Sequence, residues 1–123
     1  MWLTFISGRL SANANDLAYH ILKLALTEEY GIYHCTNNGT CSWYEFACEF
    51  LKLANISNLP QSCTTEEFYA GKESKSANRP MFSSLDNMAL RNAAKDEMRT
   101  WQEAIAMYIK NGIERGIFEW KLL

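Results

Sequence analysis

Residues 31–47 read GIYHCTNNGTCSWYEFA, and this stretch predicts a strand, a turn and the start of a helix in succession. Ile32–Thr36 fits a short strand. The sequence Asn37-Asn38-Gly39 then favours a turn, because Asn and Gly tolerate a positive φ angle. Ser42 and Glu45 make a capping box, in which each side chain accepts a hydrogen bond from the backbone of the other residue. A helix should therefore begin at Ser42.

Further strands and helices are predicted on both sides of this stretch, from apolar spacing and from helix-start signals. In chain order the predicted elements are a strand over Met1–Ile6, a helix over Asp16–Glu29, a helix from Ser42 to Asn55, a strand over Pro60–Thr64, one helical turn after Thr64, a brief helix from Asp86 or Asn87 through Ala94, and a helix from Thr100 to Asn111-Gly112. We expect a small single domain of the α/β or α+β class, with about three main helices packed on a short sheet.

Three local features support the helices. Two further capping boxes are predicted, Thr64 with Glu67 and Thr100 with Glu103. Asn13 or Asn15 can cap the first helix. One apolar face is expected on the first helix, made of Ala18, Ile21, Leu22 and Ala25. The buried stripe predicted for the last helix is Trp101, Ala104, Ile105, Tyr108 and Ile109.

The composition is that of one globular domain. The chain has 123 residues, of which 48% are hydrophobic and 13% aromatic, and this content distinguishes it from disordered chains. Its net charge of −2 argues against a general nucleic-acid binder, which carries a basic face. The apolar stretch Leu17–Leu26 is too short to cross a bilayer and contains His20 and Lys23.

The cysteines indicate a reducing compartment. Cys35, Cys41, Cys48 and Cys63 form no paired C-x-x-C motifs, so a structural zinc site is not expected. We predict that they are small buried residues in a chain without disulfides. No signal peptide is evident either. We therefore expect a soluble, cytoplasmic protein without a metal.

Residues 78–87 read NRPMFSSLDN and contain the best candidate for ligand binding. Arginine offers planar donors that match a diphosphate, and Pro80 stiffens the backbone that presents Arg79. Lys72 and Lys75 add positive charge nearby, which gives a small electropositive lip able to meet a phosphate. Two alternatives are a solvated loop, and an Arg79 that pairs with a neighbouring carboxylate and holds the loop.

The order of these phrases resembles the carboxyl-terminal part of the dTDP-4-dehydrorhamnose reductase family, which belongs to the extended short-chain dehydrogenases. The phrases are GIYHCTN at 31–37, GTCSWYEFA at 39–47, TTEEF at 64–68, RPMFSSLDN at 79–87 and WQEA at 101–104. The resemblance covers about residues 8–109. It departs at Gly8-Arg9-Leu10-Ser11, where the family has a Gly-x-Pro-Thr-like phrase. It implies a substrate-binding lobe over residues 1–112, followed by an apolar tail over residues 113–123.

The resemblance also implies a ligand and a role. Complete members of the family use NAD(P)H to reduce the 4-keto group of dTDP-4-dehydrorhamnose, which yields dTDP-rhamnose for cell-surface polysaccharide. This lobe would bind the nucleotide sugar. By resemblance Arg79 is the leading candidate to contact the diphosphate, with Asn78, Ser83 and Asn87 in support.

Catalytic residues and a cofactor site are not expected in this chain. None of its six glycines belongs to a G-x-G-x-x-G motif, the pattern that holds a dinucleotide pyrophosphate. Tyr19 and Lys23 have the Tyr-x-x-x-Lys spacing of short-chain dehydrogenases, but this two-letter match arises easily by chance. His20 and His34 are interpreted as a helix-surface residue and a strand residue.

Two functions from different classes remain open. The first is a nucleotide-sugar binding lobe that is catalytically silent alone and works with a separate chain carrying the cofactor domain. The second is a non-catalytic regulatory or protein-interaction domain derived from the same family. In that case the apolar Met1–Ile6 and the tail would be contact surfaces for a partner or a second copy.

Overall fold

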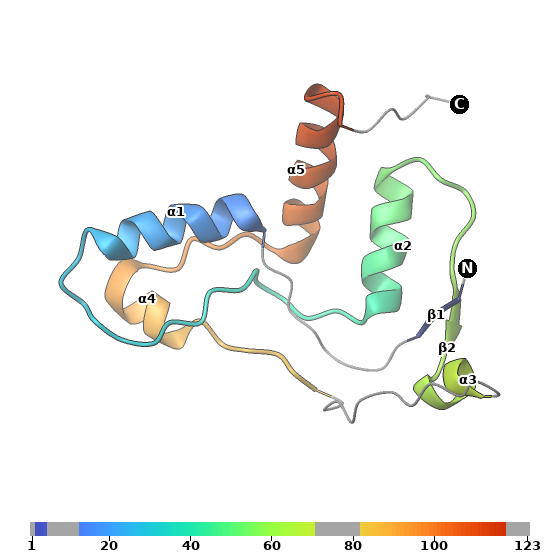
Figure 1. Ribbon diagram of the computed structural model, residues 1–123, viewed down its shortest axis with the longest axis horizontal. Coiled ribbons are helices and arrows are strands. Elements are labelled where there is room, and N and C mark those ends of the chain that lie inside the picture. The colour runs from blue at the N-terminus through green and yellow to red at the C-terminus, as the bar shows by residue number, and fades with distance from the viewer. Residues whose placement is uncertain (1, 5–12, 71–81, 118–123) are drawn as a thin grey trace.

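Five helices and one short sheet are seen in the computed structural model, which describes residues 2–4, 13–70 and 82–117 (Figure 1). The elements are β1 (Trp2–Thr4), α1 (Ala14–Ala25), α2 (Trp43–Leu53), β2 (Gln61–Cys63), α3 (Thr65–Tyr69), α4 (Met88–Ala94) and α5 (Trp101–Glu114). Helices α2 and α5 lie side by side, α1 packs next to α4, and α3 lies beside β1. The expected small mixed domain, with three main helices and a short sheet, is confirmed.

All three predicted capping boxes are present. They are Ser42 with Glu45, Thr64 with Glu67, and Thr100 with Glu103. At the start of α2, the Ser42 N–H donates to Glu45 Oε2 over 2.6 Å, and the Glu45 N–H donates to Ser42 Oγ over 3.1 Å. The backbone hydrogen bond from Ser42 lowers the pKa of the Glu45 carboxyl. Asn13 caps α1, as predicted, by accepting from the Asn15 N–H at 2.9 Å.

Two helix ends differ from the predictions. Helix α1 ends at Ala25 and does not reach Glu29. Helix α5 continues through Gly112 to Glu114, and the residue that ends it is Gly116, with a φ angle of 64°. The Ile117 N–H donates to the Gly112 carbonyl and the Gly116 N–H to the Ile113 carbonyl, which is the Schellman arrangement. Gly112 is buried inside the helix.

The sheet contains two parallel strands. Strand β1 pairs with β2 in the register Trp2 with Gln61, Leu3 with Ser62 and Thr4 with Cys63. The predicted strand over Pro60–Thr64 is confirmed, and the part of Met1–Ile6 that the structure describes is also a strand.

The predicted strand Ile32–Thr36 is wrong as an assignment of secondary structure. Residues 32–37 are neither helix nor strand. Within the described residues, no backbone–backbone hydrogen bond joins 30–36 to another segment, and a strand requires such a partner. Pairing begins only at Asn38, which forms a parallel bridge with Thr100.

The predicted turn follows directly, and Gly39 carries its positive φ angle of 86°. A Cβ atom on this residue would lie 3.2 Å from Cδ1 of Trp101. Gly39 therefore serves two purposes, since it adopts a conformation that L side chains rarely take and lets the indole approach the backbone.

The buried apolar residues form two clusters. Around α5, the first cluster is Cys41, Trp101, Ile105 and Ile109, with Phe46 and Phe50 of α2 packed against it. Around α4, the second cluster is Leu90, Ala94 and Met98, with Leu24, Tyr33 and Cys35 packed against it. The predicted stripe of α5 is buried except for Tyr108, which is exposed.

Helix α1 is oriented opposite to the expectation for an amphipathic helix. Its predicted apolar face is exposed: Ala18, Ile21, Leu22 and Ala25. The residues it buries are Asp16 and His20. The interpretation of His20 as a helix-surface residue is therefore wrong.

Replacing Leu90 by Ala should lower the free energy of unfolding by about 2–5 kcal/mol, because the side chain is fully buried and its removal leaves a cavity. Urea denaturation followed by circular dichroism measures the change. Leu59→Ala is the control, because Leu59 is largely exposed and the substitution should change stability by less than about 0.5 kcal/mol. Equal effects of the two substitutions would contradict the assignment of Leu90 to the core.

Candidate functional site

The four predicted ligand-binding residues have different positions in the structure. Asn78 and Arg79 lie outside the described residues. Ser83 is exposed in the extended stretch before α4, where a ligand can reach it. Asn87 is buried at the N-terminal end of α4. Among the described residues, the structure therefore leaves Ser83 accessible and encloses Asn87.

The Asn87 amide is a structural link. Its Oδ1 accepts from the Thr36 N–H at 3.0 Å and from the Thr36 hydroxyl at 3.1 Å. Its Nδ2 donates to the Thr36 carbonyl at 2.7 Å and to Asp96 Oδ2 at 3.1 Å. An amide side chain has two donors and two acceptor positions, and all four are used. A ligand contact by Asn87 stays a prediction, and it would require one of these bonds to be exchanged.

The predicted side-chain cap of α4 is also corrected by this geometry. Asn87 stands at the N-cap position but makes no capping hydrogen bond. Asp86 is bound instead by Arg91, whose two terminal nitrogens donate to the two carboxylate oxygens over 2.7 and 2.8 Å. This hydrogen bonding from Arg91 lowers the pKa of the Asp86 carboxyl.

A buried polar cluster lies where α1 meets the segments before α2 and α5. Asp16 forms an ion pair with Arg99 at 3.1 Å, and its other oxygen accepts from Asn37 Nδ2 at 3.3 Å. Asn37 Nδ2 also donates to the Arg99 carbonyl, and Asn37 Oδ1 accepts from the Asn13 N–H at 2.8 Å. Because each of these buried groups has a partner, the cluster has the character of a structural network.

His20 is part of the same region, and its ring is fully engaged. Its Nδ1 donates to the Asp16 carbonyl at 2.8 Å, and its Nε2 accepts from the Glu97 N–H at 3.1 Å. This pair of bonds requires the neutral ring with the proton on Nδ1. His20 has no free nitrogen with which to exchange a proton with a substrate.

Tyr19 and Lys23 are joined by a carboxylate. The Tyr19 hydroxyl and the Lys23 ammonium both donate to Glu97 Oε2, at 3.1 and 2.8 Å, and Lys95 lies 3.1 Å from the other oxygen. The hydrogen bonds from Lys23, Lys95 and Tyr19 lower the pKa of Glu97 to about 2. Through their hydrogen bonds to Glu97, the side chains of Tyr19 and Lys23 thus hold α1 to the segment before α5.

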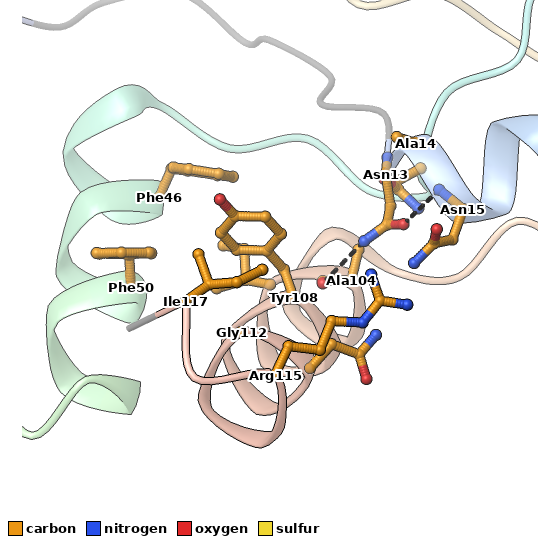
Figure 2. A pocket seen from close by; sticks show the side chains of 13 residues that line it. Asn13, Ala14, Asn15, Phe46, Phe50, Ala104, Tyr108, Gly112, Arg115 and Ile117 are labelled. Carbon is orange, nitrogen blue, oxygen red and sulfur yellow. Dashed lines mark hydrogen bonds between the residues drawn. The ribbon is translucent and has the colours of Figure 1, made fainter. Parts of the chain in front are cut away.

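A cavity of about 500 Å³ lies between α2 and α5 (Figure 2). Phe46 and Phe50 line it from α2, and Tyr108 lines it from α5. Asn13 lies at the end nearest α1, and among the described residues of the lining Arg115 is the one that carries a charge. Such a lining can hold a ring against aromatic faces and an anion near the guanidinium.

This cavity was not predicted from the sequence, because its aromatic residues occupy positions that helical spacing assigns to a core. Tyr108 was predicted to be buried in the stripe of α5, and the structure exposes it. The distance between α2 and α5 beside these aromatic residues depends on how the two helices pack, and the spacing of apolar residues in the sequence does not define it.

All four cysteines are free thiols, and the described acidic residues form no metal-binding group. Cys41 is buried as predicted, whereas Cys35, Cys48 and Cys63 are only half-buried. Burial raises the pKa of Cys41 to about 11, which keeps it protonated and unreactive. Within the described part of the chain, no group of three His, Cys, Asp or Glu side chains could hold a metal ion. None of the helices described there is long and apolar enough to cross a membrane.

Comparison with known proteins places this mixed α/β fold among substrate-binding lobes. The family model described as the RmlD substrate binding domain matches residues 10–113. The spore coat polysaccharide biosynthesis protein SpsK of Bacillus subtilis is 37% identical over 95 residues, which are 77% of this chain and 31% of SpsK. The chain belongs to the dTDP-4-dehydrorhamnose reductase family and corresponds to its carboxyl-terminal, substrate-binding part.

Two solved reductases have the same fold. A dTDP-4-dehydrorhamnose reductase of Clostridium acetobutylicum is 36% identical, with a TM-score of 0.76 over 89% of this chain and 38% of its own. That of Bacillus anthracis, solved in complex with NADP, is 29% identical, with a TM-score of 0.70 over 86% of this chain and 36% of its own. The chain therefore spans about a third of the length of these relatives.

The expected absence of a dinucleotide site in this chain stays a prediction, and it rests on the pattern of glycines. The sequence contains no G-x-G-x-x-G motif, and the nearest pair of glycines, Gly112 and Gly116, lies at the end of α5. A pyrophosphate requires a glycine turn that opens a helix. The Tyr19 and Lys23 side chains are meanwhile bound to Glu97.

Replacing Asn87 by Ala should lower the free energy of unfolding by about 1–3 kcal/mol, because it leaves half-buried backbone groups of Thr36 without their partner. Asn92→Ala is the matched control, since Asn92 is exposed on α4 and Ala favours a helix. Thermal denaturation of the two variants measures the difference. A variant at Asn87 as stable as the control would refute the structural link.

Glu97 should make stability depend on pH in the acid range. Its pKa is lowered from 4.5 to about 2, so its contribution is fully present above the unfolded pKa and is lost as the pH falls through the folded pKa. Urea midpoints of wild type and Glu97→Gln should therefore differ at pH 6 and converge as the pH falls from about 4.5 to 2.

The control for this measurement is Glu28→Gln. Glu28 is exposed and forms no ion pair with any described residue. Its substitution should leave the acid dependence as in wild type. A gap between wild type and Glu97→Gln that stays constant over this pH range would contradict the role of Glu97.

Proposed function

We propose that the chain binds a dTDP-linked sugar, either dTDP-4-dehydrorhamnose or its reduced product dTDP-rhamnose. It would do so as the substrate-binding lobe of a dTDP-4-dehydrorhamnose reductase-like protein in dTDP-rhamnose biosynthesis, and thus in the supply of cell-surface polysaccharide. The observation that carries this proposal is the family match over residues 10–113, which spans nearly all of the described chain.

The stretch before α4 is the proposed position of the diphosphate. Asn87 fixes the end of this stretch to Thr36, and Ser83 is exposed within it. Both oxygens of Asp86 are bound by Arg91. Among the described carboxylates, Asp86 stands nearest to Arg79 in the sequence, and it already has a cationic partner. This supports a ligand role for Arg79 over an ion pair with Asp86. Asn78 lies directly beside Arg79 in the sequence.

The chain is proposed to be catalytically silent alone. It offers no dinucleotide motif, and its described histidine in the core has both ring nitrogens bonded. Hydride transfer would then depend on NAD(P)H held by another part of a reductase-like protein. The free cysteines support a cytoplasmic location for this protein, because thiols stay reduced in the cytoplasm.

A non-catalytic interaction domain is the second candidate. The observation that favours it is the exposed apolar face of α1, because soluble monomers rarely leave such a face open. The two candidates differ in their response to ligand, since only the first requires a nucleotide sugar to bind.

Titration with dTDP and dTDP-rhamnose tests the proposed function. Thermal shift or backbone chemical shifts should respond to ligand at millimolar concentration or below. Arg79→Ala should weaken binding by about 10–100-fold, the usual effect of losing a hydrogen bond to a charged group, and Ser83→Ala should weaken it less. NADPH and dTDP-4-dehydrorhamnose added together should give no turnover.

The control variant is Lys110→Ala, which removes a charge of the same sign from an exposed position on α5. It should bind dTDP like wild type. No response of the wild type to either ligand would refute the binding lobe, and an unchanged affinity of Arg79→Ala would remove Arg79 from the site. Measurable turnover would refute catalytic silence.

A further inference from the structure

Residues 118–123 read FEWKLL, and apolar and charged residues alternate over the first five of them. The apolar positions are Phe118, Trp120 and Leu122, and the charged positions are Glu119 and Lys121. These residues lie outside the described part of the chain. Because an extended backbone directs successive side chains to opposite faces, this order would give an extended segment one apolar face and one charged face.

The described chain ends at the wall of the cavity between α2 and α5. Ile117 is its last residue, and the Ile117 side chain lines this cavity together with Phe50 of α2 and Tyr108 of α5 (Figure 2). The Schellman turn around Gly116 fixes the position of Ile117, whose N–H donates to the Gly112 carbonyl at 2.9 Å. The segment that follows therefore starts beside the cavity.

The walls of this cavity are apolar and are partly in contact with solvent. Tyr108 and Ile117 are 55% and 65% exposed, and Phe46 and Phe50 are only half-buried. Removing such apolar surface from water stabilises a fold. An apolar segment that starts at this wall can therefore gain stability by covering it.

The dimensions of the cavity suit the apolar face of residues 118–123. Cavities of about 300–1,000 Å³ hold drug-sized ligands, so a cavity of about 500 Å³ has room for an indole ring and a neighbouring side chain. An extended chain spans at most about 3.6 Å per residue, so Trp120 can lie up to about 11 Å from Ile117. The axes of packed helices are about 8–10 Å apart, so Trp120 can reach from α5 to α2.

The family match does not extend to this segment. The model of the RmlD substrate binding domain matches residues 10–113, which include α5 almost to its end at Glu114. A contact made by residues 118–123 is therefore a feature of this chain beyond the part that the family model covers.

We propose that residues 118–123 fold back in an extended conformation and fill the cavity between α2 and α5 with the side chains of Phe118, Trp120 and Leu122. The two charged residues between them stay in solvent. The cavity then belongs to the core of the lobe, and the chain itself closes it to any ligand. The inference does not depend on nucleotide-sugar binding, which is proposed for a different stretch.

Alanine substitutions along the segment test the alternation. Trp120→Ala should lower the melting temperature of the 123-residue chain by about 4–10 °C, because it removes a large side chain from the filled cavity. Phe118→Ala and Leu122→Ala should lower it by smaller amounts. Lys121→Ala is the matched control, and it should leave the melting temperature within about 2 °C of wild type. Equal effects of Trp120→Ala and Lys121→Ala would overturn the proposal.

A double-mutant cycle identifies the surface that the segment covers. Trp120→Ala and Tyr108→Ala together should lower the melting temperature by less than the sum of their separate effects, because each removes one side of the same contact. In the control pair, Trp120→Ala is combined with Leu59→Ala, since Leu59 is exposed and lies outside the lining of the cavity. The control effects should add. Additive effects in both pairs would mean that the segment lies elsewhere, which would refute its place in the cavity.

Two measurements on the wild type require no substitution that could prevent folding. Nuclear Overhauser contacts should join the indole protons of Trp120 to the ring protons of Phe50 or Tyr108, and their absence in the folded chain would contradict the proposal. Light scattering should show a monomer. A dimer whose formation requires these contacts, so that dilution abolishes both, would mean that the segment of a second copy fills the cavity, which would also contradict it.

Discussion

The rest of the structure depends on a short extended segment, residues 36–38, that asparagine amides hold in the middle of the domain. Asn87 binds the backbone of Thr36 on one side. Asn37 lies buried beside it and bonds Asn13, Asp16 and Arg99. An amide carries donors and an acceptor on one planar group, so it can take the place of a neighbouring strand. This link joins the cluster around α4 to the cluster around α5.

The sequence predicted those features whose causes are local. Each capping box requires only two residues three positions apart, and all three boxes were found where Ser or Thr precedes Glu. The strand after Pro60 and the turn at Gly39 were also predicted from a few adjacent residues. The end of α5 was misplaced because two glycines can each end a helix, and packing of the buried Gly112 inside the helix left Gly116 to do so.

Features that depend on distant partners were not predicted. His20 is buried because the Glu97 N–H, 77 positions away, donates to its ring, and no periodicity in α1 contains that information. Apolar spacing identified the correct face of α1 as apolar, but the usual inference that such a face is buried failed. The inference that an apolar helix face is buried assumes that the same stretch of chain contains a helix or strand that packs on this face.

The ligand-binding role of the candidate site stays a prediction. Family resemblance indicated the stretch from Asn78 to Asn87, and the structure shows how its last residue is anchored. The buried position of Asn87 was not foreseen, because an asparagine before a helix is read first as a cap. The cavity between α2 and α5 was missed for a different reason, since its aromatic lining has the spacing of a core stripe.

The bonds of residues 36–38 have a consequence for how the polypeptide acquires its structure. Their partners come 51 positions later at Asn87 and 62 positions later at Arg99. A ribosome releases the chain from its amino terminus, and contacts of long sequence separation form slowly because a long loop must close first. The helices near the amino terminus can form early, but they cannot be locked together until α4 and the residues before α5 have been synthesised. A chain interrupted before that point would leave the segment 36–38 without its partners, and it would be a substrate for proteases and chaperones.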